Sequence, residues 1–182
     1  DMIKLAQDLD MPELLVLAHY QIGVTSLFLG RAEEFLKQQQ QMLALYNADH
    51  HPTLDEKLGY DPLSDILLNT GWALKFLGYA DQSEELYRKI FDHVSEAKQP
   101  FVQANAFMCA SYHYVSMRDA ACAHEMAKKT IAISREHKYS HFLGGALGAM
   151  GWAVGEEGQL QEGINMIQDG LAILKEIGSW LL

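Results

Sequence analysis

The stretch from Gly59 to Ile90 carries the clearest pattern of hydrophobic and polar positions in the chain. Apolar or small residues recur three or four positions apart in its first half, which predicts an α-helix with one buried face. These residues are Ile66, Leu67, Thr70, Leu74 and Leu77. Asp61-Pro62 suits the start of this helix, since proline loses no hydrogen bond in a first turn, and Gly78 predicts its end. A second helix follows, with one apolar face made by Ser83, Tyr87, Ile90 and Val94.

This helix-turn-helix unit recurs along the chain. Three predicted turns are evenly spaced, at Gly78, Arg118 and Gly158, and an earlier one lies at Gly30. A small residue lies seven positions before each turn, namely Gly23, Gly71, Ser111 and Gly151. We therefore expect about four helix pairs, at about 11–46, 61–97, 100–137 and 140–177, within a single repeat array over 1–182. A polar connector is expected at 47–60.

A single helix pair of this size cannot bury its apolar face alone, but stacked pairs can. The sequence therefore predicts an all-α fold in which antiparallel helix pairs form a right-handed superhelix, with the first helix of each pair lining the concave side. In the last predicted helix, the spacing of the aliphatic residues predicts the buried face. This face consists of Ile164, Ile167, Leu171 and Leu174.

The second unit resembles the tetratricopeptide repeat (TPR). The matching residues are Gly71, Leu74, Gly78 and Ser83, with Tyr87 at a later aromatic position. The third and fourth units match less closely, and the period of about 40 residues exceeds the family's period of about 34. The resemblance implies a TPR-like α-solenoid with longer helices, which binds a protein or peptide in its concave groove.

A broader resemblance covers most of the chain. It is carried by Ala18-His19-Tyr20, Phe28-Leu29-Gly30-Arg31-Ala32, Gly59-Tyr60-Asp61-Pro62, Trp72-Ala73-Leu74, Leu77-Gly78-Tyr79-Ala80-Asp81-Gln82 and Gly151-Trp152-Ala153. These strings are similar to the C-terminal repeat region of bacterial adenylate cyclase/AAA-type signalling ATPases and related transcriptional regulators. The resemblance implies a cytoplasmic, non-catalytic sensor module, whose parent protein would carry a cyclase, kinase or ATPase domain. The chain begins at Asp1 and ends in Trp180-Leu181-Leu182, so we expect a fragment whose partners include upstream domains of the same chain.

Composition narrows the class of partner. Apolar residues make up 49% of the chain, which argues against disorder. The formal net charge of −10 argues against nucleic acid, because phosphate binding needs clustered Lys and Arg. No apolar run is long enough to span a bilayer. The two cysteines, Cys109 and Cys122, form no CxxC pair, which favours packed, reduced thiols in a cytoplasmic protein over a redox switch.

The sequence contains no strong catalytic or metal-binding motif. It lacks the Gly-x-x-x-x-Gly-Lys-Ser/Thr phosphate-binding loop and the His-Glu-x-x-His pattern. Asp49-His50-His51 is the densest group of potential ligands, but metal sites need three or four ligands in a defined geometry. We therefore expect no catalytic residue, no metal and no cofactor in these 182 residues.

The TPR register places one aromatic residue per unit on the concave side, and these residues form the candidate partner-binding site. The set consists of Trp72, Lys75, Phe76, Asn105, Met108, Tyr112, Trp152 and Glu156. Aromatic side chains with a few polar neighbours suit a peptide or ligand groove. Lys75 could pair with an acidic group, Asn105 could bond a peptide backbone and Glu156 could pair with a basic group. The alternative is that the aromatic residues only pack between units.

The glycines in the last predicted pair also have two explanations. Gly144, Gly145, Gly148, Gly151 and Gly155 all fall in one helix, where each costs about 1 kcal/mol relative to alanine. They permit either close packing of helices or room for a ligand on the concave side.

Three functions follow from these observations. The first is an interaction or sensor module that binds a protein or peptide in the groove. The second is a self-association scaffold that forms a homodimer, to which the apolar end Trp180-Leu181-Leu182 could contribute. The third is a metal-binding or enzymatic domain that uses the histidines.

Overall fold

The computed structural model describes residues 2–45, 62–95 and 99–179. Within these ranges the chain forms nine α-helices and no strand, which confirms the all-α class. The helices are α1 (Met2–Asp8), α2 (Pro12–Phe28), α3 (Ala32–Leu45), α5 (Pro62–Phe76), α6 (Ala80–Ser95), α7 (Pro100–Met117), α8 (Ala120–His137), α9 (Ser140–Glu156) and α10 (Leu160–Glu176). The predicted connector at 47–60 lies outside the described residues, as do His50, His51 and Trp180.

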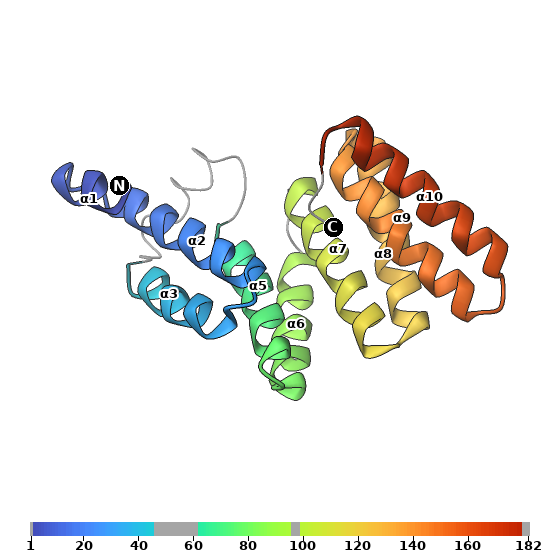
Figure 1. Ribbon diagram of the computed structural model, residues 1–182, viewed down its shortest axis with the longest axis horizontal. Helices are drawn as coiled ribbons and strands as arrows, with labels where there is room; N and C mark the ends of the chain where they lie inside the picture. The colour runs from blue at the N-terminus through green and yellow to red at the C-terminus, as the bar shows by residue number, and fades with distance from the viewer. Residues whose placement is uncertain (1, 46–61, 96–98, 180–182) are drawn as a thin grey trace. The chain divides into compact units, whose positions relative to one another are not determined.

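The chain divides into two compact units, Asp1–Ile90 and Phe91–Leu182. A continuous superhelix through both units remains a prediction. The first unit contains α1, α2, α3, α5 and most of α6. The second contains the end of α6 and α7 to α10, and Figure 1 shows α9 and α10 running side by side in opposite directions.

The turns between helices repeat one backbone conformation. Arg118, Lys138, Gly158 and Gly178 follow one another at equal intervals, and all have a positive φ of 59° to 95°. At Gly158, the backbone N–H donates to the Gly155 carbonyl, and the next N–H donates to the Val154 carbonyl. The same pair of bonds closes the turns at Gly30, Gly78, Arg118 and Gly178, and it satisfies carbonyls that a helix end would otherwise leave unpaired. The repeat period is therefore made of two helix-plus-turn segments of equal length.

The small residues before and after each turn allow two helices to approach closely. In the first unit, the Ser83 hydroxyl of α6 donates to the Gly71 carbonyl of α5 at 2.8 Å. In the second unit, a Cβ added at Gly151 of α9 would overlap the carbonyl oxygen of Gly163 in α10, and a Cβ at Gly163 would overlap that of Gly151. The two contacts have the same separation in sequence, which supports the internal repeat inferred from the sequence.

The predicted buried face of α6 is confirmed. Ser83, Tyr87, Ile90 and Val94 are all at most 3% exposed. In the first unit the core is built from α2, α3 and α5, and it includes Val16, Leu27, Phe35, Met42 and Ile66.

The predicted buried face of α10 is wrong at two positions. Ile164 is 39% exposed and Leu171 is 57% exposed, whereas Leu174 is buried. The reason is that Gly163 and Gly170 form the contact with α9, because their missing side chains let the two backbones meet. The buried face is therefore turned toward the glycines, and the larger aliphatic residues lie to one side of it.

Candidate functional site

The best candidate site in the second unit lies where α7 and α9, the first helices of two successive pairs, contact each other. We call it the α7–α9 face and define it by Asn105, Tyr112, Gly148, Trp152, Gly155 and Glu156. The Tyr112 hydroxyl donates to the Gly145 carbonyl at 2.9 Å. This bond ties the two helices together across the face. Five of the predicted binding residues lie on this pair of adjacent helices, and all of them except Met108 belong to the α7–α9 face.

Burial sets the chemistry of Tyr112. Burial raises the pKa of its phenol to about 12, with a smaller contribution from nearby Cys109. The phenol is therefore protonated at all physiological pH values, and it acts as a hydrogen-bond donor rather than as a base. Tyr112 serves here as a structural anchor, and part of its side chain still reaches the surface.

This anchoring role predicts a pH-dependent effect of Tyr112→Phe. Near neutral pH the variant should lose about 1 kcal/mol of stability, the typical net value of one hydrogen bond. The folded-state pKa is raised above the unfolded value of about 10, so the contribution of the phenol is complete below pH 10 and falls as the pH rises toward 12. By about pH 11 the wild type should have lost about 1.4 kcal/mol that the Phe variant keeps. Denaturant unfolding at both pH values checks this, and a constant gap between the two proteins would contradict it.

Met108 differs from the other predicted groove residues because it is only 8% exposed. It packs in a core cluster with Ala104 of α7 and Phe142 of α9. Its sulfur also fills the space beside Gly145, where an added Cβ would lie 2.9 Å from it. At Met108 the packing alternative therefore describes the residue better than a groove does, since a side chain so deeply buried offers little surface to a partner.

The glycines of α9 fall into two groups. Gly144 and Gly151 face α10 closely, and an added Cβ at either position would overlap it. An added Cβ at Gly148 or Gly155 would overlap no other atom. A Cβ at Gly148 would meet only the Tyr112 hydroxyl, at 3.4 Å, and one at Gly155 would meet only Leu160, at 4.0 Å. These two glycines flank Trp152 on the same side of the helix, so the surface next to this half-buried tryptophan is bare backbone.

A charged rim borders the face. The Glu156 carboxylate lies 3.8 Å from the Arg118 guanidinium, and the neighbouring Glu157 carboxylate lies 3.3 Å from the His124 ring. Both pairs are largely solvent-exposed, so each contributes little to stability. The Arg118 partner of Glu156 was not predicted, because the two residues lie far apart in sequence and no local pattern links them. At the Asn105 end of the α7–α9 face, the Cys109 thiol lies 3.8 Å from the Asn105 side-chain oxygen, within reach of a weak hydrogen bond.

The three predicted residues on α5, namely Trp72, Lys75 and Phe76, lie in the first unit. The Trp72 and Phe76 rings meet edge to face, with centroids 6.2 Å apart. Phe76 is 63% exposed, whereas Trp72 packs against the core of the unit. Burial lowers the pKa of Lys75, an effect that the nearby Glu84 partly offsets. That this aromatic pair belongs to the same groove as the α7–α9 face remains a prediction.

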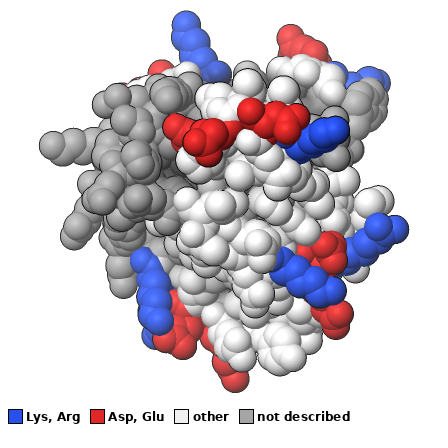
Figure 2. Space-filling view, turned by 90° about the vertical axis from the view of Figure 1, so that its left-hand side faces the viewer, with Lys and Arg blue, Asp and Glu red and all other residues white. Residues whose placement is uncertain are grey.

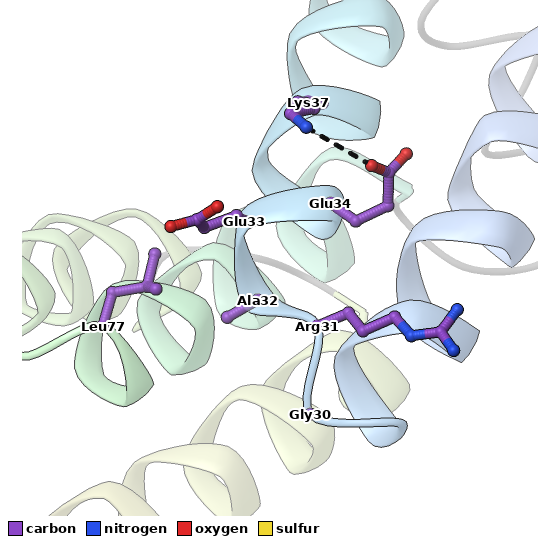
Figure 3. Close-up of a pocket in the computed structure, with 7 residues that line it drawn as sticks. All are labelled: Gly30, Arg31, Ala32, Glu33, Glu34, Lys37 and Leu77. Carbon is purple, nitrogen blue, oxygen red and sulfur yellow. Dashed lines mark ion pairs between the residues drawn. The ribbon is translucent and has the colours of Figure 1, made fainter.

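A hollow that the sequence did not predict lies at the turn between α2 and α3. Its volume is about 430 Å³, and it is lined by Gly30, Arg31, Ala32, Glu33, Glu34, Lys37 and Leu77. Figure 3 shows the Lys37–Glu34 ion pair, 3.7 Å long, along this hollow. A smaller hollow lies at the equivalent turn of the next pair, around Gly78 and Tyr79. Because both follow the same turn, we interpret them as products of the turn geometry and not as a specialised site.

The face drawn in Figure 2 carries no basic patch, and the described residues include no group that could hold a metal. Figure 2 views the side of the molecule at the left of Figure 1, and Lys and Arg there are interspersed with Asp and Glu instead of forming a basic patch. No group of three or more His, Cys, Asp or Glu side chains is arranged to hold a metal among the residues described. Cys109 and Cys122 are half-buried thiols. None of the described helices is both long enough and apolar enough to cross a membrane.

Comparisons with known proteins assign no family to the chain. Models of known protein families gave no match. Curated proteins gave none either.

Proposed function

We propose that this chain is a non-catalytic interaction module that binds a protein or peptide partner on the α7–α9 face. The observation that carries the proposal is the combination of an exposed part of Trp152 with the bare backbone at Gly148 and Gly155. Helix-interior glycines cost about 1 kcal/mol each when they pack against nothing. A partner that uses the space beside Trp152 would account for this cost.

The chemistry of the face suggests the kind of partner. An aromatic side chain at the centre of a small surface is the usual anchor of a protein interface. Asn105 can donate and accept hydrogen bonds with a peptide backbone. The Glu156 carboxylate on the rim beside Trp152 is exposed and pairs with Arg118 only at 3.8 Å, so a basic residue of the partner can replace that pairing. We therefore propose a peptide segment with an apolar anchor and a neighbouring Lys or Arg.

The proposal extends to the family and the setting of the protein. The turn spacing and the small-residue contacts support a TPR-like repeat, although the helices are longer than in that family. The resemblance to bacterial signalling ATPases supports a cytoplasmic sensor function in a larger protein. In that setting the partner would be a peptide or an upstream domain of the same chain.

The test is selection of peptides from a random library against the purified chain, followed by calorimetric titration. We expect the selected peptides to contain a hydrophobic residue close to Lys or Arg. The Trp152→Ala variant should bind them at least about tenfold more weakly, the loss typical of an interface anchor. Leu29→Glu, which changes an exposed residue in the other unit, serves as the control and should bind normally. Equal affinity of the Trp152→Ala variant and the wild type would overturn the proposal.

A further inference from the structure

Arg118 occupies a turn position at which the other helix pairs carry glycine. The turn between the two helices of a pair contains one residue of positive φ, which is Gly30, Gly78 or Gly158 in three of the pairs. In the remaining pair this residue is Arg118, with a φ of 59°. A side chain in the left-handed conformation brings its Cβ too close to the following carbonyl, so glycine is favoured there. Arginine therefore strains this turn, and a role of its side chain must account for its presence.

The Arg118 side chain reaches the rim of the α7–α9 face. Its guanidinium lies 3.8 Å from the carboxylate of Glu156, which follows Trp152 by one helical turn on the same side of α9. This distance exceeds the length of a hydrogen bond, and the two side chains are 77% and 42% exposed. An exposed ion pair of this kind stabilises a fold very little. The pair therefore does not offset the strain of the turn.

The position of the guanidinium affects which groups can approach Glu156. A Lys or Arg of a partner meets the positive charge of Arg118, which weakens its attraction to the carboxylate. Because the Arg118 contact is longer than a hydrogen bond, a partner cation that donates directly to the carboxylate forms the stronger pair. A partner that is also held by other contacts can therefore displace Arg118, whereas a solitary cation gains little.

We propose that Arg118 is a specificity-determining residue of the α7–α9 face. Its guanidinium competes with the partner's basic residue for Glu156, so a segment that offers only positive charge binds weakly. A segment that also buries an apolar side chain against Trp152 gains enough from that contact to displace Arg118. Weakening the binding of wrong partners is a common source of specificity. Arg118 has this role only if the partner binds on the α7–α9 face, as proposed above.

The test is calorimetric titration with a peptide that is selected from a random library against the wild type and contains an apolar residue beside Lys or Arg. The Arg118→Gly variant should bind this peptide about two- to fivefold more tightly, the effect of one exposed charge interaction. The same peptide with its basic residue changed to glutamine should show no gain. Because glycine relieves the strained turn, the melting temperature of the variant should rise by about 2–4 °C.

Lys138→Gly is the matched control. Lys138 is also an exposed cation at a positive φ, of 60°, so its substitution removes the same charge and relieves the same strain. It precedes α9, whereas Glu156 ends that helix of 17 residues, and a helix of this length spans about 25 Å. The control should therefore gain in melting temperature without gaining affinity for the peptide.

Unchanged affinity of Arg118→Gly for the basic peptide would overturn the proposal, as would an equal gain with the glutamine peptide or with Lys138→Gly. A melting temperature below that of the wild type would also overturn it, because the Arg118–Glu156 pair would then be a structural contact. Trp152→Ala shows which proposal has failed. If it loses affinity while Arg118→Gly changes nothing, only the role of Arg118 is wrong, whereas normal binding by Trp152→Ala refutes the α7–α9 face itself.

Discussion

Replacing Gly163 by alanine should lower the free energy of unfolding by about 3 kcal/mol, the cost of forcing an extra methyl group into a filled helix contact. The added Cβ would overlap the carbonyl oxygen of Gly151 and come within 3.0 Å of the Gly155 nitrogen. Both are backbone atoms of α9, so no side-chain rotation can relieve the overlap. The helix propensity of alanine, which favours the substitution by about 1 kcal/mol, offsets only part of this cost.

The matched variant for this prediction is Gly155→Ala. Its new Cβ would lie 4.0 Å from the nearest side chain, so the gain in helix propensity should raise the free energy of unfolding by about 0.5–1 kcal/mol. Urea unfolding, followed by circular dichroism, measures both variants against the wild type. The close packing of α9 on α10 would be refuted by a Gly163→Ala protein as stable as the wild type.

Replacing Tyr87 by alanine should have a still larger effect, about 4 kcal/mol, typical of removing a buried aromatic side chain. Tyr87 is fully buried in α6, and its ring lies under Gly71 of α5, where an added Cβ would be 2.6 Å from it. Its hydroxyl donates to the Leu68 carbonyl at 3.1 Å. The side chain therefore fills the space that Gly71 leaves and joins the two helices at two points.

Tyr87→Phe separates the two contributions of this residue. It keeps the ring and loses only the hydrogen bond, so we expect a cost of about 1 kcal/mol. Chemical unfolding of both variants gives the comparison. If the alanine variant lost no more stability than the phenylalanine variant, the packing of the ring under Gly71 would not be what holds α5 and α6 together.

The sequence was sufficient to predict the paired helices from α2 to α10 and the spacing of their turns, whereas α1 lies outside the expected pairs. The prediction succeeded because glycine and proline mark the ends of helices directly, and because the repeat supplies several copies of each signal. The buried face of α6 also followed from periodicity, since Ser83, Tyr87, Ile90 and Val94 lie on one side of an ideal helix. Local patterns of this kind depend only on residues a few positions apart.

Features that depend on contacts between distant residues could not be predicted in this way. On α10 the periodicity of aliphatic residues pointed to Ile164 and Leu171, because a hydrophobic pattern gives no weight to glycine. The contact with α9 instead runs through Gly163 and Gly170. For the same reason the sequence could not distinguish Met108, which is buried against Gly145, from Tyr112, which reaches the surface.

The glycines of α9 were the most informative signal that the sequence left open. Two explanations, close helix packing and space for a ligand, were both available for all five. The structure assigns close packing to Gly144, Gly145 and Gly151 and leaves Gly148 and Gly155 without it. The positions that lack a packing explanation are the ones beside Trp152, and this coincidence underlies the proposed function.

The α7–α9 face is therefore tested most directly at Gly155, where an added Cβ would touch only Leu160, at 4.0 Å. We would titrate a peptide selected against the wild type into the Gly155→Ala and Gly155→Leu variants by calorimetry. We expect near-normal affinity for Gly155→Ala and a loss of at least about tenfold for Gly155→Leu, since leucine would occupy the space beside Trp152. Unchanged affinity of a folded Gly155→Leu protein would show that the partner binds elsewhere, and would contradict the proposed function.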